Sequence, residues 1–279
     1  PVDIILVMKH SLPLAPQFFV TAPQPCPYLN NRIERKLFTG LNEINGEALN
    51  NTLSSQGFRR SQNVLYRPAC VGCSACISAR IRVNDFSLSK SQKRILNKNS
   101  NLIRGYHLAL ATDEQYDLFN KYLNKRHSDG GMSEMTIFEY SSMLEETPIN
   151  TKIVEYHSKT KNGRHKLNCV SLTDVLDDGL SMVYSFFNPE LTKLSLGKFM
   201  ILDHINIAQE MNLKYLYLGY WVPGSKKMDY KSKFSALELY INGEWKFSSD
   251  ISEFDSNAFK GSEYSILEQV SQLPLPPKY

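Results

Sequence analysis

Three cysteines stand three positions apart in the run Cys70-Val-Gly-Cys73-Ser-Ala-Cys76, and Cys26 precedes them in a proline-rich segment. Cysteines at i, i+3 and i+6 of a turn can converge on one ion, and four thiolates can complete a tetrahedral zinc site. The same spacing opens the ferredoxin run of iron–sulfur proteins, although no cysteine follows Cys76 where that run continues. The spacing therefore predicts zinc or an iron–sulfur cluster on Cys26, Cys70, Cys73 and Cys76 (the cysteine cluster), ahead of buried free thiols that act as small apolar groups.

A second place for chemistry is the loop Ser195-Leu196-Gly197, which follows a strand expected at 180–187 and precedes a helix expected from Lys198. The first turn of a helix presents backbone N–H groups without helical partners at the positive end of its dipole. A glycine at that point lets a ligand approach the backbone closely. The arrangement suits an anion or the oxyanion of an acyl-transfer reaction, held by the backbone of Leu196 and Gly197.

The positive charge of the chain is concentrated in one segment. The net charge is only +4, but residues 80–104 hold seven Lys or Arg and a single acid, Asp85. Residues 77–83 alternate apolar and polar side chains, which predicts a half-buried strand that presents Arg80 and Arg82 on its polar side. A local basic patch on a nearly neutral body favours a polyanion partner such as nucleic acid, and a solvated basic surface is the alternative.

The next helix is expected to carry part of this patch. Ser89 with Gln92 three residues later forms a capping-box pattern. Lys90, Arg94 and Lys98 then follow at a spacing of four, so they lie on one helix face. Such a face suits tRNA phosphates, which supply affinity without reading sequence.

The remaining elements predict a mixed α/β layout. Residues 31–55 suggest short strands and turns, and residues 57–67 suggest one strand that leads into the cysteine cluster. Asp177-Asp178-Gly179 predicts a hairpin between the two strands that flank it. The further expected elements are helices near 112–126 and 137–145, strands at 152–157, 167–175 and 180–187, the helix from 198, and a strand at 213–222. Hairpin, loop, helix and strand in this order indicate an open sheet.

Composition narrows the class of protein. The 279 residues suit two modest domains or one large one, and the 42% apolar fraction allows a substantial core. No apolar stretch is long enough to span a membrane. Five cysteines without an export signal point to a reducing compartment, so the sequence predicts a cytoplasmic protein.

Many of these segments together resemble one family, the bacterial aspartate/glutamate leucyltransferases (leucyl-tRNA–protein transferases), which are relatives of the arginyl-tRNA–protein transferases. The resemblance runs in order from about Cys26 to Glu238. The motifs that carry it are Cys26-Pro-Tyr-Leu, Tyr66-Arg-Pro-Ala-Cys-Val-Gly-Cys-Ser-Ala-Cys, Arg80-Ile-Arg-Val, Ser89-Lys-Ser-Gln-Lys-Arg, Arg126-His127 before Gly130-Gly131-Met132, Tyr184-Ser-Phe-Phe-Asn-Pro189, Ser195-Leu-Gly197, Tyr217-Leu-Gly-Tyr-Trp221 and Lys227-Met-Asp-Tyr-Lys231.

The resemblance implies transfer of leucine from leucyl-tRNA to the N-terminal amine of proteins that begin with Asp or Glu, which marks them for degradation in the N-degron pathway. It implies an α+β fold: an N-terminal cysteine-containing domain of short strands (residues 1–105) and a GNAT-like acyltransferase domain with an open mixed sheet (residues 106–279). The acyl donor is the charged tRNA, and no nucleotide cofactor is expected. Asn188 and Ser225 depart from the family pattern, and Asn188 in place of an acid weakens an acid–base role there.

Roles follow for individual residues under this reading. The backbone of Leu196 and Gly197, with Tyr184 and Asn188, is expected at the reacting acyl group. Recognition of an acidic first residue requires cations, and guanidinium groups bind carboxylates bidentately. The substrate-binding candidates are Arg80, Arg82, Arg126, Lys227, Lys231, Ser185 and Tyr220.

Two other functions remain open from the residues alone. The donor could be arginyl-tRNA or an acyl-CoA, because the same loop would serve either. The chain could also be a non-catalytic module that binds metal and RNA through the cysteine cluster and the basic patch. The sequence leaves undecided the identity of the metal, the division of the basic residues between substrate and tRNA, the oligomeric state and the cellular substrates.

Overall fold

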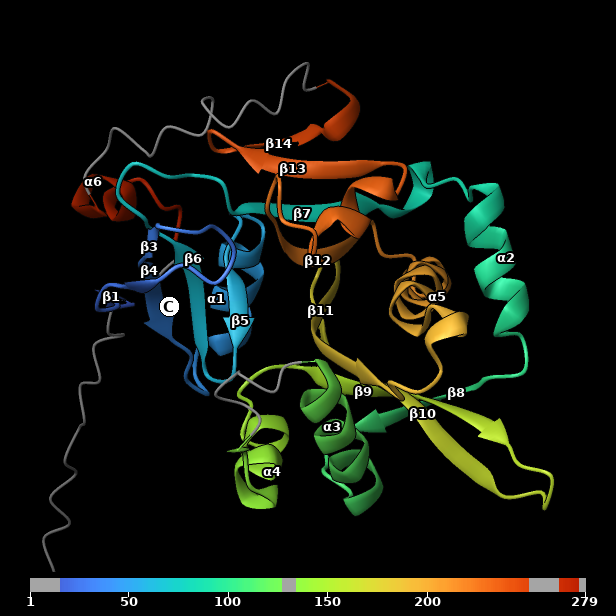
Figure 1. Cartoon of the computed structure of the whole chain (residues 1–279). Coiled ribbons are helices and arrows are strands. Elements are labelled where there is room, and N and C mark those ends of the chain that lie inside the picture. The colour runs from blue at the N-terminus through green and yellow to red at the C-terminus, as the bar shows by residue number, and fades with distance from the viewer. Residues whose placement is uncertain (1–15, 127–133, 251–265, 276–279) are drawn as a thin grey trace, which may run out of the picture.

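A computed structural model describes residues 16–126, 134–250 and 266–275 of the chain. Two sheets and the helices around them form the molecule (Figure 1). The larger sheet has eight strands in the order β14-β13-β7-β12-β11-β10-β9-β8. All neighbours in it are antiparallel except β11 and β12, which are parallel. Its strands are β7 (Ile77–Arg82), β8 (Ile103–Leu108), β9 (Thr151–Lys159), β10 (His165–Val175), β11 (Gly179–Phe187), β12 (Tyr215–Trp221), β13 (Leu237–Ile241) and β14 (Glu244–Phe247).

The smaller sheet belongs to the N-terminal part of the chain. Its order is β1-β4-β6-β5, and α1 (Gly46–Ser54) packs on it. Its strands are β1 (Phe18–Val20), β4 (Lys36–Gly40), β5 (Arg59–Ser61) and β6 (Val64–Pro68), and a separate pair is formed by β2 (Gln24–Pro25) and β3 (Ile33–Glu34). Leu273 and Leu275, which follow the C-terminal helix α6 (Ile266–Ser271), join the apolar core of this sheet. A small N-terminal strand region beside a large mixed sheet is the coarse architecture that the sequence predicted.

Helices cover both faces of the large sheet. On one face α5 (Leu196–Glu210) and α2 (Lys90–Lys98) pack against β7, β11 and β12. On the other face α3 (Asp113–Arg126) and α4 (Ile137–Glu145) pack against β9, β10 and β11. Within β11, Leu180 and Met182 join the first core, whereas Val183 and Phe186 join the second. The described chain also has the short 3-10 helices η1 (Val83–Asp85), η3 (Thr192–Leu194), η4 (Asp229–Lys233) and η5 (Ser248–Asp250).

Several local predictions are confirmed. The Ser89 hydroxyl accepts from the Gln92 backbone N–H at 3.3 Å, and the Gln92 side chain accepts from the Ser89 N–H at 2.9 Å, which is the expected capping box. The hairpin between β10 and β11 turns at the expected Asp-Asp-Gly sequence. The helix α4 has the bounds that the sequence predicted.

Other local predictions are wrong. Residues 46–54 form the helix α1 rather than strands and turns, and Asn45 at its start makes no side-chain cap. The single strand expected at 57–67 is the hairpin β5–β6, which turns at Gln62 with a positive φ of 49°. The polar side expected for β7 is also absent, because β7 lies between β12 and β13 and is buried on both faces.

Contacts between the two sheets bring β5 against the large sheet. The buried Arg60 guanidinium binds the Asp174 carboxylate of β10 with two hydrogen bonds of 2.7 Å. The Tyr220 hydroxyl of β12 donates to the carbonyl oxygens of Gly57 and Tyr66. The boundary proposed between residues 105 and 106 falls inside β8, and β7 from the N-terminal side lies within the large sheet, so segments from both sides build that sheet.

Candidate active site between strands β11 and β12

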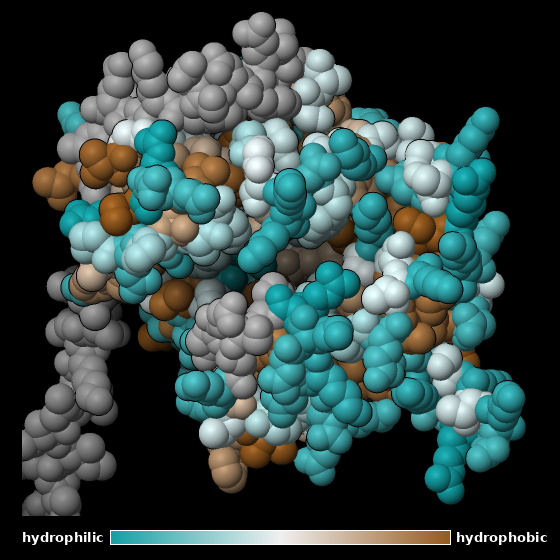
Figure 2. Space-filling view, viewed as in Figure 1, coloured by the Kyte–Doolittle hydropathy of each residue, from teal (hydrophilic) through white to brown (hydrophobic). Residues whose placement is uncertain are grey.

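The parallel strands β11 and β12 separate into an open wedge. They pair only between Gly179–Ser181 and Tyr215–Tyr217, although β11 continues to Phe187 beside β10 and β12 continues to Trp221 beside β7. A register shift in β12 precedes Gly219, whose φ is +71°. Backbone groups that face the wedge have no partner strand and must be satisfied in another way. Figure 2 shows this face of the molecule hollowed at its centre, where Figure 1 places these two strands.

Arg59 of β5 reaches into the wedge and contacts both of its walls. Its guanidinium donates to the carbonyl oxygen of Val183 in β11 at 2.5 Å. On the other side it lies against Gly219 of β12, so closely that a Cβ at this position would collide with the guanidinium. The glycine therefore has two functions: it adopts a left-handed backbone conformation and it leaves room for the cation.

Lys231 of η4 holds the other wall of the wedge. Its ammonium donates to the carbonyl oxygens of Leu218 at 2.8 Å and Tyr220 at 2.5 Å, both beyond the point where β11 stops pairing with β12. The side chain is buried, and burial lowers the pKa of Lys231 well below its usual value, with the positive charge of Arg59 adding to the effect. The described part of the chain offers it no carboxylate partner. Lys231 thus replaces the missing strand for the backbone of β12.

Aromatic side chains surround these two cations. Tyr184 and Phe187 come from β11, Tyr122 from α3 and Tyr230 from η4. The rings of Tyr122 and Phe187 lie 5.0 Å apart in an edge-to-face arrangement. Burial raises the pKa of Tyr184, Tyr122 and Tyr230, and the charge of Arg59 partly offsets this rise for Tyr184 and Tyr230. These hydroxyl groups stay protonated and can donate hydrogen bonds at neutral pH.

The N-terminus of α5 lies at the end of β11. Ser195 precedes the helix in a left-handed conformation with a φ of 53°, and its carbonyl oxygen accepts from the N–H groups of Lys198 and Phe199. The N–H groups of Leu196 and Gly197 donate to no acceptor within the described residues. A Cβ on Gly197 would lie 3.2 Å from the Phe187 ring, so this helix end adjoins the aromatic side of the wedge. The site combines a cation, phenol donors and free backbone N–H groups, a combination that can bind a carboxylate and a developing oxyanion.

Comparison with known proteins identifies the family. Models described as the N terminus and the C terminus of arginine-tRNA-protein transferase match residues 24–94 and 114–241. An aspartate/glutamate leucyltransferase of Ruegeria sp. (strain TM1040) is 58% identical over 96% of this chain and 97% of its own length. One of Jannaschia sp. (strain CCS1) is 56% identical over 96% of this chain and 93% of its own length. The chain belongs to the aspartate/glutamate leucyltransferase family.

Membership of this family makes the chain a transferase enzyme, and the two family matches include Arg59, β11, the start of α5 and Lys231. Among solved structures, one titled "Crystal structure of FemX" is similar with a TM-score of 0.44 and 8% identity, over 68% of this chain and 67% of that one. That level of similarity is too low to establish a shared fold. The described helices include none that is both long and apolar enough for a membrane crossing.

Two arginines predicted to bind substrate are engaged inside the protein. The Arg80 guanidinium, expected on a polar surface, is buried; it donates to the Glu238 carboxylate at 2.7 Å and to the Tyr217 hydroxyl at 3.1 Å. Arg82 donates to the same Glu238 carboxylate at 2.5 Å and is half-exposed. The prediction that Arg80 lies on an exposed polar surface is therefore wrong, because the neighbouring strand β13 places the buried carboxylate of Glu238 beside it.

Three further candidates hold the backbone rather than an open surface. The Tyr220 hydroxyl is buried and donates to two carbonyl oxygens of the N-terminal sheet region. Asn188 is buried, and its side-chain oxygen accepts from the Glu190 N–H at 3.1 Å to close a turn. The Lys231 ammonium donates two hydrogen bonds to backbone carbonyl oxygens of β12. These contacts give the three side chains structural roles, and their contact with substrate stays a prediction.

The remaining substrate candidates lie in or beside the wedge, or stand exposed. Tyr184 lines the wedge, and Ser185 follows it in β11, opposite Ser171 of β10. Arg126 is exposed at the end of α3, with its guanidinium 5.7 Å from the centre of the Phe187 ring. Lys227 is exposed in the segment before η4. Their contacts with substrate stay predictions.

The exposed part of the basic patch is smaller than the sequence indicated. Arg80 and Arg82 share the Glu238 carboxylate, Arg82 also pairs with Asp85, and Arg104 forms ion pairs with Asp203 and Glu210. The charges left exposed, with no ion pair among the described residues, are those on α2: Lys90, Lys93, Arg94 and Lys98 (the basic face of α2). Figure 2 shows hydrophilic side chains gathered over this helix.

The cysteine cluster consists of partly buried free thiols. Burial raises the pKa of Cys70, and it raises the pKa of Cys76 to about 12, with the neighbouring thiols and Glu34 as smaller causes. The four cysteines thus lie in one neighbourhood. Within the residues that the structure describes, however, no three Cys, His, Asp or Glu side chains are arranged to hold a metal ion. Metal or cluster binding stays a prediction.

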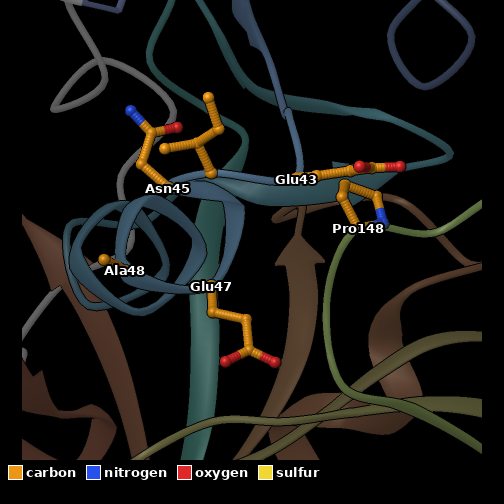
Figure 3. A pocket seen from close by; sticks show the side chains of 6 residues that line it. Glu43, Asn45, Glu47, Ala48 and Pro148 are labelled. Atoms are coloured by element: carbon orange, nitrogen blue, oxygen red, sulfur yellow. The ribbon is translucent and has the colours of Figure 1, made fainter. Parts of the chain in front are cut away.

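A shallow pocket of about 370 Å³ lies at the start of α1 (Figure 3), and its lining differs from that of the wedge in charge. Its lining includes the carboxylates of Glu43 and Glu47 together with Asn45, Ala48 and Pro148, and no cation. Negative charge repels both tRNA and an acidic acceptor. This pocket is therefore unsuited to either substrate.

Sequence reasoning missed Arg59, Tyr122, Tyr230 and Phe187 as site residues. Tyr230 and Phe187 stand in the sequence only as members of two of the family motifs. The signal that could have found Arg59 is the pair Arg59-Arg60 in a strand, because successive side chains in a strand point to opposite faces. If one of two adjacent arginines in an edge strand points to solvent, the other must point to the opposite side of the strand.

Proposed function

We propose that the chain transfers leucine from leucyl-tRNA to the N-terminal amine of proteins that begin with Asp or Glu, in the N-degron pathway. The observation that carries this proposal is the wedge between β11 and β12: it holds the Arg59 guanidinium, for which the described residues offer no carboxylate, and the start of α5 with its free backbone N–H groups adjoins its aromatic side at Phe187. Membership of the leucyltransferase family supports the choice of donor and acceptor. The GNAT-like character of the acyltransferase region is part of the same proposal.

The chemistry requires positioning more than activation. The aminoacyl ester is already reactive, and an N-terminal amine titrates near neutrality, so a fraction is unprotonated at pH 7. The amine nitrogen attacks the ester carbonyl, a C–N bond forms, and the C–O bond to the ribose breaks. The proton lost by the amine goes to the departing ribose oxygen. We assign the stabilisation of the negative oxygen of the intermediate to the N–H groups of Leu196 and Gly197.

In this proposal, the basic face of α2 binds the phosphates of the tRNA. Asn99, at the end of α2, donates to the carbonyl oxygen of Leu194 at 2.9 Å, which ties this helix to the segment before α5. A tRNA whose phosphates follow α2 could then present its 3′ end to the wedge. Because charged tRNA is a cytoplasmic reactant, the proposal places the reaction in the cytoplasm.

The test supplies the purified protein with leucyl-tRNA, arginyl-tRNA or acetyl-CoA and with peptides that begin with Asp, Glu, Lys or Ala. Mass spectrometry of the peptide measures the added group. The expected product is leucine on the Asp and Glu peptides from leucyl-tRNA alone. Transfer from acetyl-CoA without tRNA, or from arginyl-tRNA only, would contradict the proposal. Tight, salt-sensitive RNA binding without any transfer would favour a non-catalytic module instead.

A further inference from the structure

Arg59 is partly buried, and no carboxylate in the described ranges forms an ion pair with it; Arg67 of β6 also has no acidic partner, but it donates to the Gln269 side chain instead. Four other arginines of the sheets do have acidic partners: Arg60 with Asp174, Arg80 and Arg82 with Glu238, and Arg104 with Asp203 and Glu210. A charged group that is withdrawn from water without a partner lowers stability, so such groups are uncommon unless a ligand completes them.

The donors of Arg59 face open space. A guanidinium has five N–H donors, and one hydrogen bond, to the Val183 carbonyl oxygen, is formed. No Arg59 nitrogen belongs to the fully buried polar atoms without partners in the described chain, so the unused donors are reachable from solvent. They lie between the walls of the wedge, because the same guanidinium contacts Val183 of one wall and Gly219 of the other.

The surroundings of Arg59 favour a small anion. Lys231 lies near enough that the charge of Arg59 lowers its pKa. The protonated hydroxyl groups of Tyr184 and Tyr230 lie within the field of Arg59. An anion between these groups would offset the positive charge of Arg59, favour the protonated form of Lys231, and accept hydrogen bonds from guanidinium and phenols.

On the basis of the proposed function, we propose that Arg59 is the specificity-determining residue that binds the side-chain carboxylate of the acceptor's first residue, Asp or Glu. A carboxylate and a guanidinium form paired N–H···O bonds, which an amide or an apolar side chain cannot reproduce. The phosphates of tRNA have an exposed alternative on α2, whereas Arg59 lies inside the wedge, between Val183 and Gly219. An acidic first residue held there brings its amine to the place where the acyl group is expected.

The fold positions Arg59 through its neighbour. Successive residues of β5 point to opposite sides, and Arg60 is fixed by two hydrogen bonds to the buried Asp174 carboxylate. Gly219 provides the space on the facing strand. Arg60, Asp174 and Gly219 are thus positioning residues for the guanidinium.

The test compares the parent protein with Arg59→Gln and Arg59→Lys, using peptides that differ only in a first residue of Asp, Asn or Ala. For Arg59→Gln, kcat/KM with the Asp peptide is expected to fall at least roughly 30-fold, the effect of removing one partner of a buried charged pair. Transfer to the Asn and Ala peptides should change less than about threefold. Arg59→Lys keeps the charge and should retain part of the preference for Asp. The matched control Arg104→Gln removes a guanidinium that is paired on α5 and should leave the preference unchanged.

Direct calorimetric binding of the Asp and Asn peptides, without tRNA, provides a readout independent of turnover. The parent should prefer the Asp peptide, and both Arg59 variants should weaken or remove that preference; thermal unfolding checks that each variant is folded. An equal loss with all three acceptors, with a raised KM for leucyl-tRNA, would assign Arg59 to the donor and overturn the proposal. An unchanged Asp preference in a folded variant would also overturn it. A parent protein that transfers no leucine at all contradicts the proposed function instead, and the binding comparison still judges Arg59.

Discussion

Loss of the buried ion pair between Arg60 and Asp174 should strongly lower the free energy of unfolding. Both side chains are 1% exposed, and two hydrogen bonds of 2.7 Å join them across the two sheets. Asp174→Asn preserves the shape of the side chain but leaves the guanidinium buried without its counter-charge. Removal of one member of a buried pair costs about 3–5 kcal/mol of unfolding free energy. In urea, a slope of about 2–3 kcal/mol per molar converts this loss into a midpoint lower by about 1–2.5 M.

The assay is urea unfolding followed by tryptophan fluorescence, with Arg104→Gln as the control. Arg104 is 23% exposed and its acidic partners are partly exposed, so its loss should cost no more than about 1 kcal/mol. The double variant Arg60→Met with Asp174→Leu removes both charges and should recover most of the stability, because apolar side chains can replace a buried pair. The reasoning is refuted if Asp174→Asn costs as little as the surface control, or if the double variant is no more stable than Asp174→Asn.

Three further outcomes follow from the structure. Replacement of the basic face of α2 by Gln should raise KM for leucyl-tRNA and flatten its dependence on salt, with the preference among acceptor peptides unchanged; an unchanged salt slope would show that the tRNA lies elsewhere. Burial lowers the pKa of His204 to about 4, below its unfolded value near 6.5, so stability should fall by up to about 3 kcal/mol as pH drops from 6.5 to 4, and urea titrations of His204→Gln should show a flatter pH profile. Protein purified without oxygen should carry zinc or iron by elemental analysis if the cysteine cluster binds metal, and variants of the cluster should lose it; a metal-free parent with full activity would contradict that prediction.

The parts of the fold that the sequence predicted correctly are those determined by neighbours in the chain. The capping box of α2 joins two residues three positions apart, and the β10–β11 hairpin depends on three turn residues between two alternating strands. The free N–H groups at the start of α5 likewise follow from a local loop and a glycine. In each case the physical cause lies within a few residues, so a single sequence is enough to recognise it.

Charge roles could not be predicted in the same way because they depend on pairing between distant segments. Arg80 was expected to face a polyanion, but Glu238, which lies 158 residues later, neutralises it inside the sheet. The sequence shows the count of charges in a segment, and it does not show which carboxylate the fold delivers to each. Arg59 escaped notice for the opposite reason: its function depends on the absence of such a partner and on Gly219 of another strand.

The same physical problem explains why the cations of the wedge are where they are. Two parallel strands that separate leave carbonyl oxygens without N–H partners, and unpaired carbonyl groups shielded from water lower stability. Arg59 satisfies Val183, while Lys231 satisfies Leu218 and Tyr220. Lys231 is buried and has only three donors, so its capacity is largely used by the backbone, whereas the guanidinium of Arg59 has donors left. Opening a sheet to admit a substrate thus requires cations for structural reasons. Of these cations, Arg59 has donors left over and is therefore the one able to bind the carboxylate of an acidic acceptor.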